Sequence, residues 1–377
     1  MPLAQVDSGP DEVEAVARVM RSQWLTMGPI TENFEARFAR FHNTKHALAV
    51  SSGTAALHLA YLAIGLSAGD EVIMPSLTFV ATASAAVACG ARPVFAEVIS
   101  DDEPTIDPDH VAALITQRTR AITVVHYAGY ACRMDEIKAV ADQHRLAVIE
   151  DCAHAPGVRY GDRYIGTVGT LGCFSFFSNK NMTTAEGGMV LTESDELASR
   201  IRSLRCHGMS SGTWDRYTGR PPGYDVVDFG WNYRIDEIRS ALGLVQLSKL
   251  EGNNSRRCEL MRRYREQLSR SPDVQIPFKA YHGRSAYHIL PLLLGKQVER
   301  ERLVSGLTQA GIQTSHHYVP IHQLHAYRER YGYEPGILPR TDSFARREVT
   351  LPLYSSMQDS DVDYVAEAVN RLMAASA

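Results

Sequence analysis

Short apolar runs and amphipathic segments alternate along the first 150 residues of the chain. The apolar runs predict strands at residues 46–50, 71–74, 93–97, 121–125 and 146–149, and the segments between them predict helices at residues 54–64, 79–88, 111–115 and 134–144. Strands that are apolar throughout and separated by helices are typical of a mostly parallel sheet covered on both faces. The pattern therefore predicts an α/β fold.

The pattern changes after residue 151. Two strands are predicted close together, at residues 172–177 and 189–192, followed by helices at residues 195–206 and 235–250. The segment 208–228 between these helices is rich in Gly, Pro, Ser and Tyr, and loops of this length are often functional. The rest of the chain is typical of a smaller α+β domain. We therefore expect a large domain at residues 1–253 and a small C-terminal domain at residues 254–377.

Composition narrows the classes of protein that fit. The chain has 377 residues, of which 45% are hydrophobic and 22% charged, and its formal net charge is −4 with no long block of one sign, so we expect no nucleic-acid partner. No apolar run approaches the ~18 residues that cross a bilayer, and the acidic segment 1–16 is unlike a signal peptide. The six cysteines form no CxxC pair, which favours reduced thiols and a cytoplasmic protein without a membrane partner.

Two charged side chains follow neighbouring predicted strands. Asp151 ends an apolar run, where ligands bind in open α/β sheets, and Lys180 lies just past the next strand. Pyridoxal phosphate requires this pairing, because a lysine forms the Schiff base with its aldehyde and a carboxylate keeps the ring nitrogen protonated. Burial beside Phe176 and Phe177 would lower the pKa of the lysine. The alternatives are an exposed lysine and a loop-capping aspartate.

A candidate phosphate site precedes the first predicted helix. Residues 51–57 end a strand and open a helix, so Gly53 permits close approach of the backbone, Thr54 adds a hydroxyl group, and the helix N-terminus offers free N–H groups. Ser175 would add a second hydroxyl group. The segment lacks the Gly-Lys-Ser/Thr ending of a nucleotide-binding loop. The alternative is a helix cap that binds nothing.

An aromatic ring and an imidazole complete the candidate chemistry. Phe79 stands at the start of a predicted helix, where a ring can lie flat against a cofactor, although its spacing fits a core phenylalanine equally well. His154 follows Asp151 closely and either contacts the cofactor or caps the turn after the strand. No residue pattern indicates a metal site.

About ten segments in register resemble the sugar aminotransferases of the DegT/DnrJ/StrS type. These are pyridoxal-phosphate enzymes with the aspartate-aminotransferase-like fold, fold type I. The matching segments cover nearly the whole chain and are residues 24–29, 52–56, 69–73, 75–79, 125–129, 150–154, 174–176, 180–181, 186–188, 232–234 and 351–354. The resemblance implies a large domain with a mostly parallel central sheet and a smaller C-terminal α+β domain.

The resemblance also implies a role for each matching residue. The cofactor would be bound by Lys180 through its Schiff base, Asp151 at the ring nitrogen, Phe79 on the ring face, Gly53, Thr54 and Ser175 at the phosphate, and His154 near the phenolic oxygen. Asn232 would reach the phosphate of the neighbouring subunit, which implies a homodimer with shared active sites. His317, Tyr318 and His322, and similarly residues 24–26, would lie at the active-site mouth, where His317 and Tyr318 would contact the substrate. The alternative for these residues is an ordinary surface loop.

The activity implied by the resemblance is a ping-pong amino transfer. L-Glutamate would give its amino group to the cofactor, and a nucleotide-linked keto-deoxysugar with its carbonyl at C3 or C4 would accept it. Three alternatives stay open. They are a keto-cyclitol aminotransferase of the aminoglycoside kind, a sugar dehydratase, in which histidine replaces the lysine, and a non-catalytic sensor of pyridoxal phosphate or a sugar nucleotide.

Overall fold

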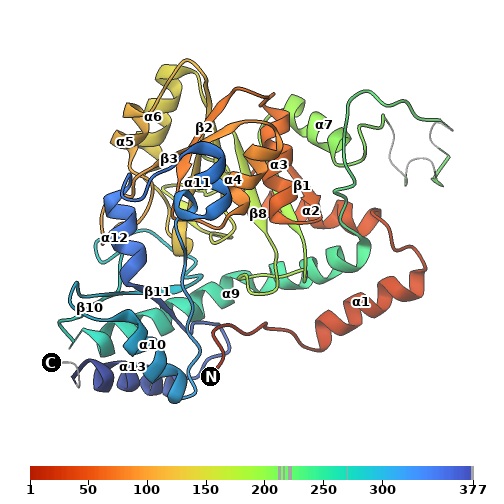
Figure 1. Cartoon of the computed structure of the whole chain (residues 1–377). Helices are drawn as coiled ribbons and strands as arrows, with labels where there is room; N and C mark the ends of the chain where they lie inside the picture. The colour runs from red at the N-terminus through yellow and green to blue at the C-terminus, as the bar shows by residue number, and fades with distance from the viewer. Residues whose placement is uncertain (211–213, 215–216, 220–222, 270, 375–377) are drawn as a thin grey trace.

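The computed structural model describes residues 1–210, 214, 217–219, 223–269 and 271–374. Part of the expected 208–228 loop therefore lies outside the described residues. A large sheet with helices on both faces forms the upper part of the molecule in Figure 1, and a smaller sheet with its own helices forms the lower part. The predicted α/β fold with a C-terminal α+β part is confirmed.

The central sheet has seven strands in the order β1-β9-β8-β5-β4-β2-β3. They are β1 (His46–Val50), β2 (Glu71–Pro75), β3 (Arg92–Ala96), β4 (Thr119–Val125), β5 (Ala147–Asp151), β8 (Leu171–Ser175) and β9 (Gly188–Thr192). Neighbouring strands are parallel except at β9, which is antiparallel to both β8 and β1. Val125, Asp151 and Cys173 are register partners, so β4 and β5 end together and β8 ends two residues farther along, at the same edge of the sheet.

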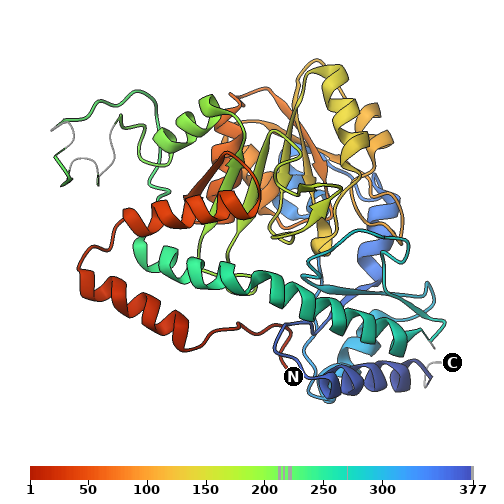
Figure 2. The same cartoon turned by 180° about the vertical axis from the view of Figure 1, so that it is seen from behind.

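Helices and short elements of the first 268 residues cover this sheet. They are α1 (Pro10–Ser22), α2 (Pro29–Phe41), α3 (Gly53–Ala63), α4 (Ala81–Ala88), α5 (Pro108–Ala113), η1 (Tyr127–Gly129), α6 (Met134–His144), the hairpin of β6 (Arg159–Tyr160) and β7 (Arg163–Tyr164), α7 (Asp195–Leu204) and α9 (Glu237–Leu268). Figure 2 shows α2 against the sheet and α9 running between α2 and α1, both of which it contacts. Phe34 and Phe38 of α2 are fully buried against Phe174 and Phe176, which anchors this layer.

The helix predicted at residues 235–250 continues to Leu268. A polar run at residues 251–257 conceals this continuation in the sequence, yet Asn254 and Arg257 are buried there. Their hydrogen bonds satisfy them, since Asn254 Nδ2 donates to Pro156 O at 2.9 Å and Arg257 Nη1 donates to Leu353 O at 2.9 Å. The expected domain boundary at residue 253 falls inside this continuous helix, and the division there stays a prediction.

The C-terminal part has its own antiparallel sheet and hydrophobic core. Its elements are β10 (Val274–Gln275), β11 (Leu290–Leu294), α10 (Arg300–Gln309), η2 (Ile321–Gln323), α11 (His325–Tyr331), α12 (Pro339–Arg347), β12 (Glu348–Leu351) and α13 (Asp359–Ala374). The chain start joins this part, because Gln313 N donates to Met1 O and Leu353 N donates to Leu3 O. Among the described residues, no helix combines the length and the apolar character that crossing a membrane requires.

Candidate active site

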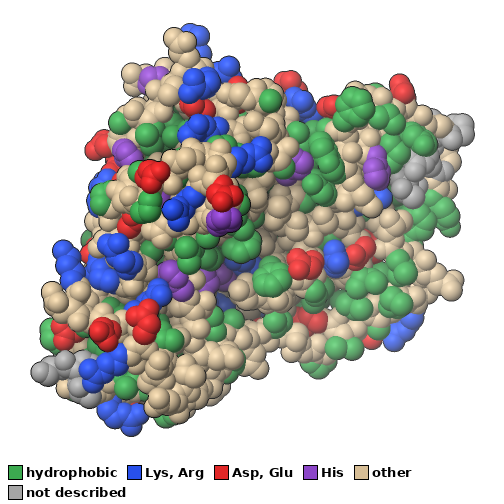
Figure 3. All heavy atoms as spheres, in the orientation of Figure 1, with side chains coloured by type: hydrophobic (Ala, Val, Ile, Leu, Met, Phe, Trp, Pro, Cys, Tyr) green, Lys and Arg blue, Asp and Glu red, His purple; other side chains and the backbone are tan. Residues whose placement is uncertain are grey.

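A cavity of about 320 Å³ opens where β4, β5 and β8 end. Figure 3 shows this face of the molecule hollowed between its upper and lower parts, with histidine side chains gathered in the hollow. The structure brings most of the predicted site residues to the cavity wall, namely Gly53, Thr54, Phe79, Asp151, His154, Ser175, Lys180, His317 and Tyr318. Residues far apart in the sequence therefore line one space.

The start of α3 forms a compact polar cradle on one wall. Ser52 caps the helix by accepting from Ala55 N at 3.1 Å, as the capping alternative expected. The helix start lines the cavity with Gly53 and the exposed Thr54, and the cap uses only the N–H group of Ala55 among the first N–H groups of the helix. A Cβ atom at position 53 would lie 2.7 Å from Ser175 Cβ, so only glycine lets the strand end and the helix start approach this closely. This donor set suits a phosphate group.

Asp151 and Lys180 lie on the cavity wall, and neither is the exposed surface residue of the alternative reading. Asp151 accepts from Thr82 Oγ1 at 2.8 Å and from Ala153 N at 3.1 Å, so it also caps the turn. Burial raises the pKa of Asp151, and the nearby positive charge of Lys180 opposes this rise. Burial lowers the pKa of Lys180 to about 8, and the Asp151 carboxylate opposes this fall. Lys180 therefore exchanges between its ammonium and free-amine forms near pH 8, well below the usual range of a lysine.

Phe79 and His154 face the same space. Phe79 precedes α4 and is 58% exposed, so the core interpretation of this ring is wrong. Its ring centroid lies 6.2 Å from that of Tyr318. His154 is buried, and its Nε2 lies 2.9 Å from the Tyr318 hydroxyl group, while its Nδ1 has no partner among the described residues. Burial holds the pKa of His154 well below its usual value, so the neutral ring can offer a polar atom to a bound group.

His317 is held by two neighbours from β12. Its Nδ1 lies 2.7 Å from Thr350 Oγ1, and its backbone N–H donates to Glu348 Oε2 at 2.9 Å. Thr350 Oγ1 also bonds to Glu348 Oε1. Burial raises the pKa of Glu348 to about 8 and lowers that of His317 to about 4. Sequence patterns gave no signal for Glu348, because an acid before an apolar run resembles an ordinary strand start.

A buried histidine that no sequence pattern indicates lies beside Lys180. His288, just before β11, is buried, and its Nε2 lies 3.4 Å from Lys180 Nζ. Its Nδ1 lies 2.9 Å from Asn181 Oδ1. Only the tertiary structure joins these residues, since His288 is 108 positions beyond Lys180.

Three of the expected residues lie away from the cavity wall. Asn232 is exposed and forms an isolated bridge with Cys206. His322 is buried and bonded to Ser76, with Nδ1 2.8 Å from Ser76 Oγ. Trp24 packs its ring against Trp214, with centroids 4.7 Å apart. Their assigned roles stay predictions.

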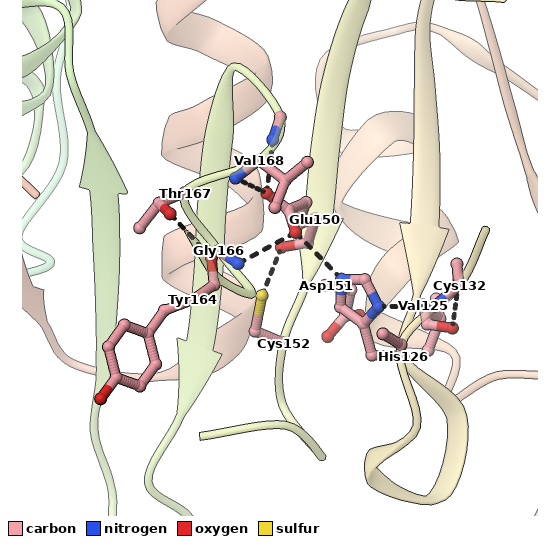
Figure 4. Close-up of polar contacts among 12 residues, drawn as sticks. Val125, His126, Cys132, Glu150, Asp151, Cys152, Tyr164, Gly166, Thr167 and Val168 are labelled. Atoms are coloured by element: carbon pink, nitrogen blue, oxygen red, sulfur yellow. Dashed lines mark hydrogen bonds and ion pairs between the residues drawn. The ribbon is translucent and has the colours of Figure 1, made fainter. Parts of the chain in front are cut away.

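A buried cluster beside the cavity has metal-ligand residue types but no free ligand atoms. Figure 4 shows Glu150 between His126 and the loop that carries Gly166 and Val168. Its carboxylate accepts from His126 Nε2 and from the N–H groups of Gly166, Val168 and Gly169. Burial raises the pKa of the Cys152 thiol well above its usual value, which keeps it protonated. The cluster therefore ties a loop to β5.

Comparison with known proteins decides the family. Residues 6–370 match the DegT/DnrJ/EryC1/StrS aminotransferase family. The chain belongs to this family. This aminotransferase is 40% identical over 370 residues to the spore coat polysaccharide biosynthesis protein SpsC of Bacillus subtilis, a match that covers 97% of this chain and 95% of SpsC.

Solved structures agree with this assignment. PseC of Helicobacter pylori, an aminotransferase involved in the biosynthesis of pseudoaminic acid, superposes with a TM-score of 0.93 at 30% identity and 99% coverage of both chains. The PLP-form of the putative sugar aminotransferase Spr1654 from Streptococcus pneumoniae gives 0.92 at 28% identity, with 100% and 99% coverage. This aminotransferase is therefore a pyridoxal-phosphate enzyme of fold type I.

The cavity of this aminotransferase fits the cofactor. The α3 cradle offers phosphate donors, and the tight approach at Gly53 and Ser175 shapes it. Asp151 supplies a buried carboxyl group, and His154 Nδ1 is a buried polar atom that lacks a partner among the described residues. Lys180 supplies an amine of lowered pKa. The residues present thus match the phosphate, the ring and the aldehyde of pyridoxal phosphate.

Proposed function

We propose that this aminotransferase moves an amino group from L-glutamate to a nucleotide-linked keto-deoxysugar with its carbonyl at C3 or C4, by ping-pong chemistry. The observation that carries the proposal is Lys180 on the wall of a cavity that Asp151 and the α3 cradle also line. SpsC is named for spore coat polysaccharide biosynthesis, and Spr1654 is named as a putative sugar aminotransferase, which supports a sugar acceptor.

The geometry of the cavity supports the proposed cofactor-binding roles. Gly53, Thr54 and Ser175 would hold the phosphate, and Phe79, with its exposed ring, would cover one face of the pyridine. Asp151 would bind the ring nitrogen and His154 the phenolic oxygen. When bound, pyridoxal phosphate supplies an electron sink for the bond to the transferred nitrogen.

Lys180 would move the protons of the reaction. With a pKa of about 8, its Nζ is largely available as a free amine at slightly alkaline pH. A free amine in this position can take a proton from the carbon that bears the amino group and return it elsewhere in the same half-reaction. Lys180 thus acts as both base and acid at one atom.

His317 and Tyr318 would meet the sugar. Both residues line the cavity, and the Glu348–Thr350 pair fixes the position of His317. The low pKa of His317, about 4, keeps its ring neutral, so it would bind sugar hydroxyl groups by hydrogen bonds.

The proposed assembly is a homodimer with shared active sites. Exposed apolar side chains precede α9, including Tyr224, Val226, Val227 and Phe229, the last 89% exposed. Figure 3 shows hydrophobic side chains gathered at this end of the molecule. A patch of this kind marks a protein interface, and a second copy is the occupant that would let the exposed Asn232 reach a neighbouring cavity.

Addition of L-glutamate to the cofactor-loaded enzyme tests the proposed half-reaction. The absorbance of the bound cofactor should shift to that of its amine form and return on addition of 2-oxoglutarate. Lys180→Ala should reduce the rate of this shift by at least about 10³-fold, because the proton-moving amine is lost. Lys296→Ala is the control, since Lys296 is exposed and is not one of the cavity-lining residues.

The acceptor is tested by running the reaction backwards with 2-oxoglutarate and a panel of amino compounds. Turnover of 3- or 4-amino nucleotide sugars supports the proposal. Turnover of amino-cyclitols alone would replace it with the cyclitol alternative. An unchanged cofactor spectrum with glutamate would favour a sensor, and water loss from a keto sugar without amine transfer would favour a dehydratase.

A further inference from the structure

A chain of hydrogen bonds fixes the orientation of the Asn181 amide beside the cavity. Asn181 Nδ2 donates to Ala286 O at 2.7 Å and to Asn254 Oδ1 at 2.7 Å. A backbone carbonyl can only accept, so the NH₂ group of Asn181 must face Ala286. Asn254 is oriented in turn, because its own NH₂ group donates to Pro156 O. The carbonyl oxygen of Asn181 therefore faces His288.

This orientation selects one tautomer of His288. Asn181 Oδ1 lies 2.9 Å from His288 Nδ1 and can only accept, so Nδ1 carries the proton and donates it. The other nitrogen, Nε2, then bears the lone pair. It lies 3.4 Å from Lys180 Nζ, within reach of an N–H group of that amine.

The surroundings keep His288 in this neutral form. Burial holds its pKa well below the usual value, and the positive charges of Lys180 and Arg257 act in the same direction. The other titratable groups that face it are His154, whose ring centroid is 4.3 Å away, and His317. Arg257 Nη1 donates to His288 O and so also fixes the backbone. His288 thus presents a hydrogen-bond acceptor and no proton to Lys180.

We propose that His288 is a positioning residue for Lys180, whose Nζ donates a hydrogen bond to His288 Nε2 whenever the amine is not bonded to the cofactor. The proposal rests on the proposed function only in taking Lys180 as the reacting amine. The hydrogen bond removes one rotational freedom of a long side chain and aims its nitrogen into the cavity. It also stabilises the ammonium form, which offsets part of the effect of burial on Lys180.

Two substitutions of His288 test the roles of its two ring nitrogens separately. His288→Asn keeps an N–H donor near the position of Nδ1, and so the bond to Asn181, but removes the acceptor that faces Lys180. His288→Gln places an amide oxygen near the position of Nε2 and keeps an acceptor for Lys180. The first variant removes the proposed interaction, and the second restores it.

Competitive acylation of Lys180, read by mass spectrometry as a function of pH in the cofactor-free full-length protein, gives the pKa of the amine without any turnover. We expect His288→Asn to lower this pKa by about one unit and His288→Gln to keep it near the wild-type value. In cofactor-loaded protein, single-turnover rates with glutamate should fall about tenfold in His288→Asn, with the glutamate concentration for half-saturation little changed, and recover in His288→Gln.

The outcomes distinguish this inference from the proposed function. Equal Lys180 pKa values in the wild type and in His288→Asn would overturn the hydrogen bond, whatever the activity. A lowered pKa with an unchanged single-turnover rate would overturn the positioning role. If Lys180→Ala still reacts with glutamate, the proposed function is wrong. The labelling experiment still tests the hydrogen bond between His288 and Lys180, because it does not depend on turnover. The inference is supported if His288→Gln restores both the Lys180 pKa and the single-turnover rate.

Discussion

Burial sets the acid–base character of single residues in the cavity. It lowers the pKa of Lys180 to about 8 and holds those of His154 and His288 well below the usual value, so the imidazoles are neutral acceptors or donors near neutral pH. It raises the pKa of Asp151, and a protonated ring nitrogen beside that carboxyl group would favour its charged form. The chemistry of the site therefore depends on burial as much as on residue type.

Glu348 gives a pH-dependent prediction at this scale. Its pKa rises from 4.5 to about 8 because it is fully buried, although Arg300 and the hydrogen bonds from Thr350 and His317 oppose the rise. An unfolded chain ionises this group above about pH 4.5, whereas the folded protein does not. The protonated Glu348 therefore contributes its full stabilisation of the folded protein below pH 4.5, and this contribution is lost as the pH rises to about 8.

Glu348→Gln should remove this dependence, because a glutamine has the donor and acceptor of the protonated acid. Urea unfolding measures this dependence. Between pH 5 and pH 8, the free energy of unfolding of the wild type should fall by on the order of a few kcal/mol more than that of the variant. Glu367→Gln on α13 is the control, since Glu367 is exposed and should leave the pH profile unchanged. Parallel profiles for Glu348→Gln and the wild type would show that Glu348 stays ionised in the folded protein.

At the scale of elements, the common end of β4, β5 and β8 creates the site. The register places Asp151 opposite Val125 and Cys173, so one edge of the sheet presents the carboxyl group to the cavity. The preceding residue, Glu150, points to the opposite side and holds the loop at residues 166–169 (Figure 4). Because successive side chains of a strand point to opposite sides, Asp151 lines the cavity and Glu150 binds the loop.

Glu150→Gln should destabilise the protein by about 2–4 kcal/mol, because an NH₂ group would replace an oxygen that accepts two N–H donors. Thermal unfolding of the cofactor-loaded enzyme measures the loss, and Glu367→Gln again serves as the exposed control. A variant as stable as the wild type would mean that the loop finds other acceptors at little cost.

Several elements could be predicted from the sequence and others could not. The helix at residues 134–144 was placed correctly because its apolar spacing is regular, and the strands near it differ by one or two residues at their ends. The sequence does not predict the second half of α9, because the polar residues Asn254 and Arg257 are typical of an exposed segment although both are buried. Helix α2 was missed although Phe34, Phe38 and Phe41 have helical spacing.

At the scale of the whole molecule, α9 passes from the central sheet to the C-terminal core, and the chain start rests on that core as well. The cavity takes His317 and Tyr318 from the C-terminal part and Lys180 and Asp151 from the sheet. One further residue, Asn232, is expected to act in the cavity of a second copy.

Mixed dimers test this expectation. Lys180→Ala and Asn232→Asp are each expected to be inactive, the second because its carboxylate would repel the partner's phosphate. Differently tagged chains, co-expressed and purified through both tags, should form dimers with one intact site, which gives about half the activity of the wild-type dimer. Absence of recovery would place Asn232 in its own cavity, and activity of Asn232→Asp by itself would place it outside any site. A doubly mutated chain paired with the wild type provides the control, because neither of its sites is intact.

The sequence by itself determined the α/β architecture, the position of Asp151 at the end of a strand, the position of Lys180 past the next strand, and the polar start of α3, because these depend on local periodicity and on the chemistry of adjacent residues. The tertiary structure alone decided that His288 meets Lys180 and that Glu348 lies behind His317. It also decided the shifted pKa values of these groups. The physical reason is that burial and hydrogen bonding across 108 positions arise only when the two parts of the chain pack together.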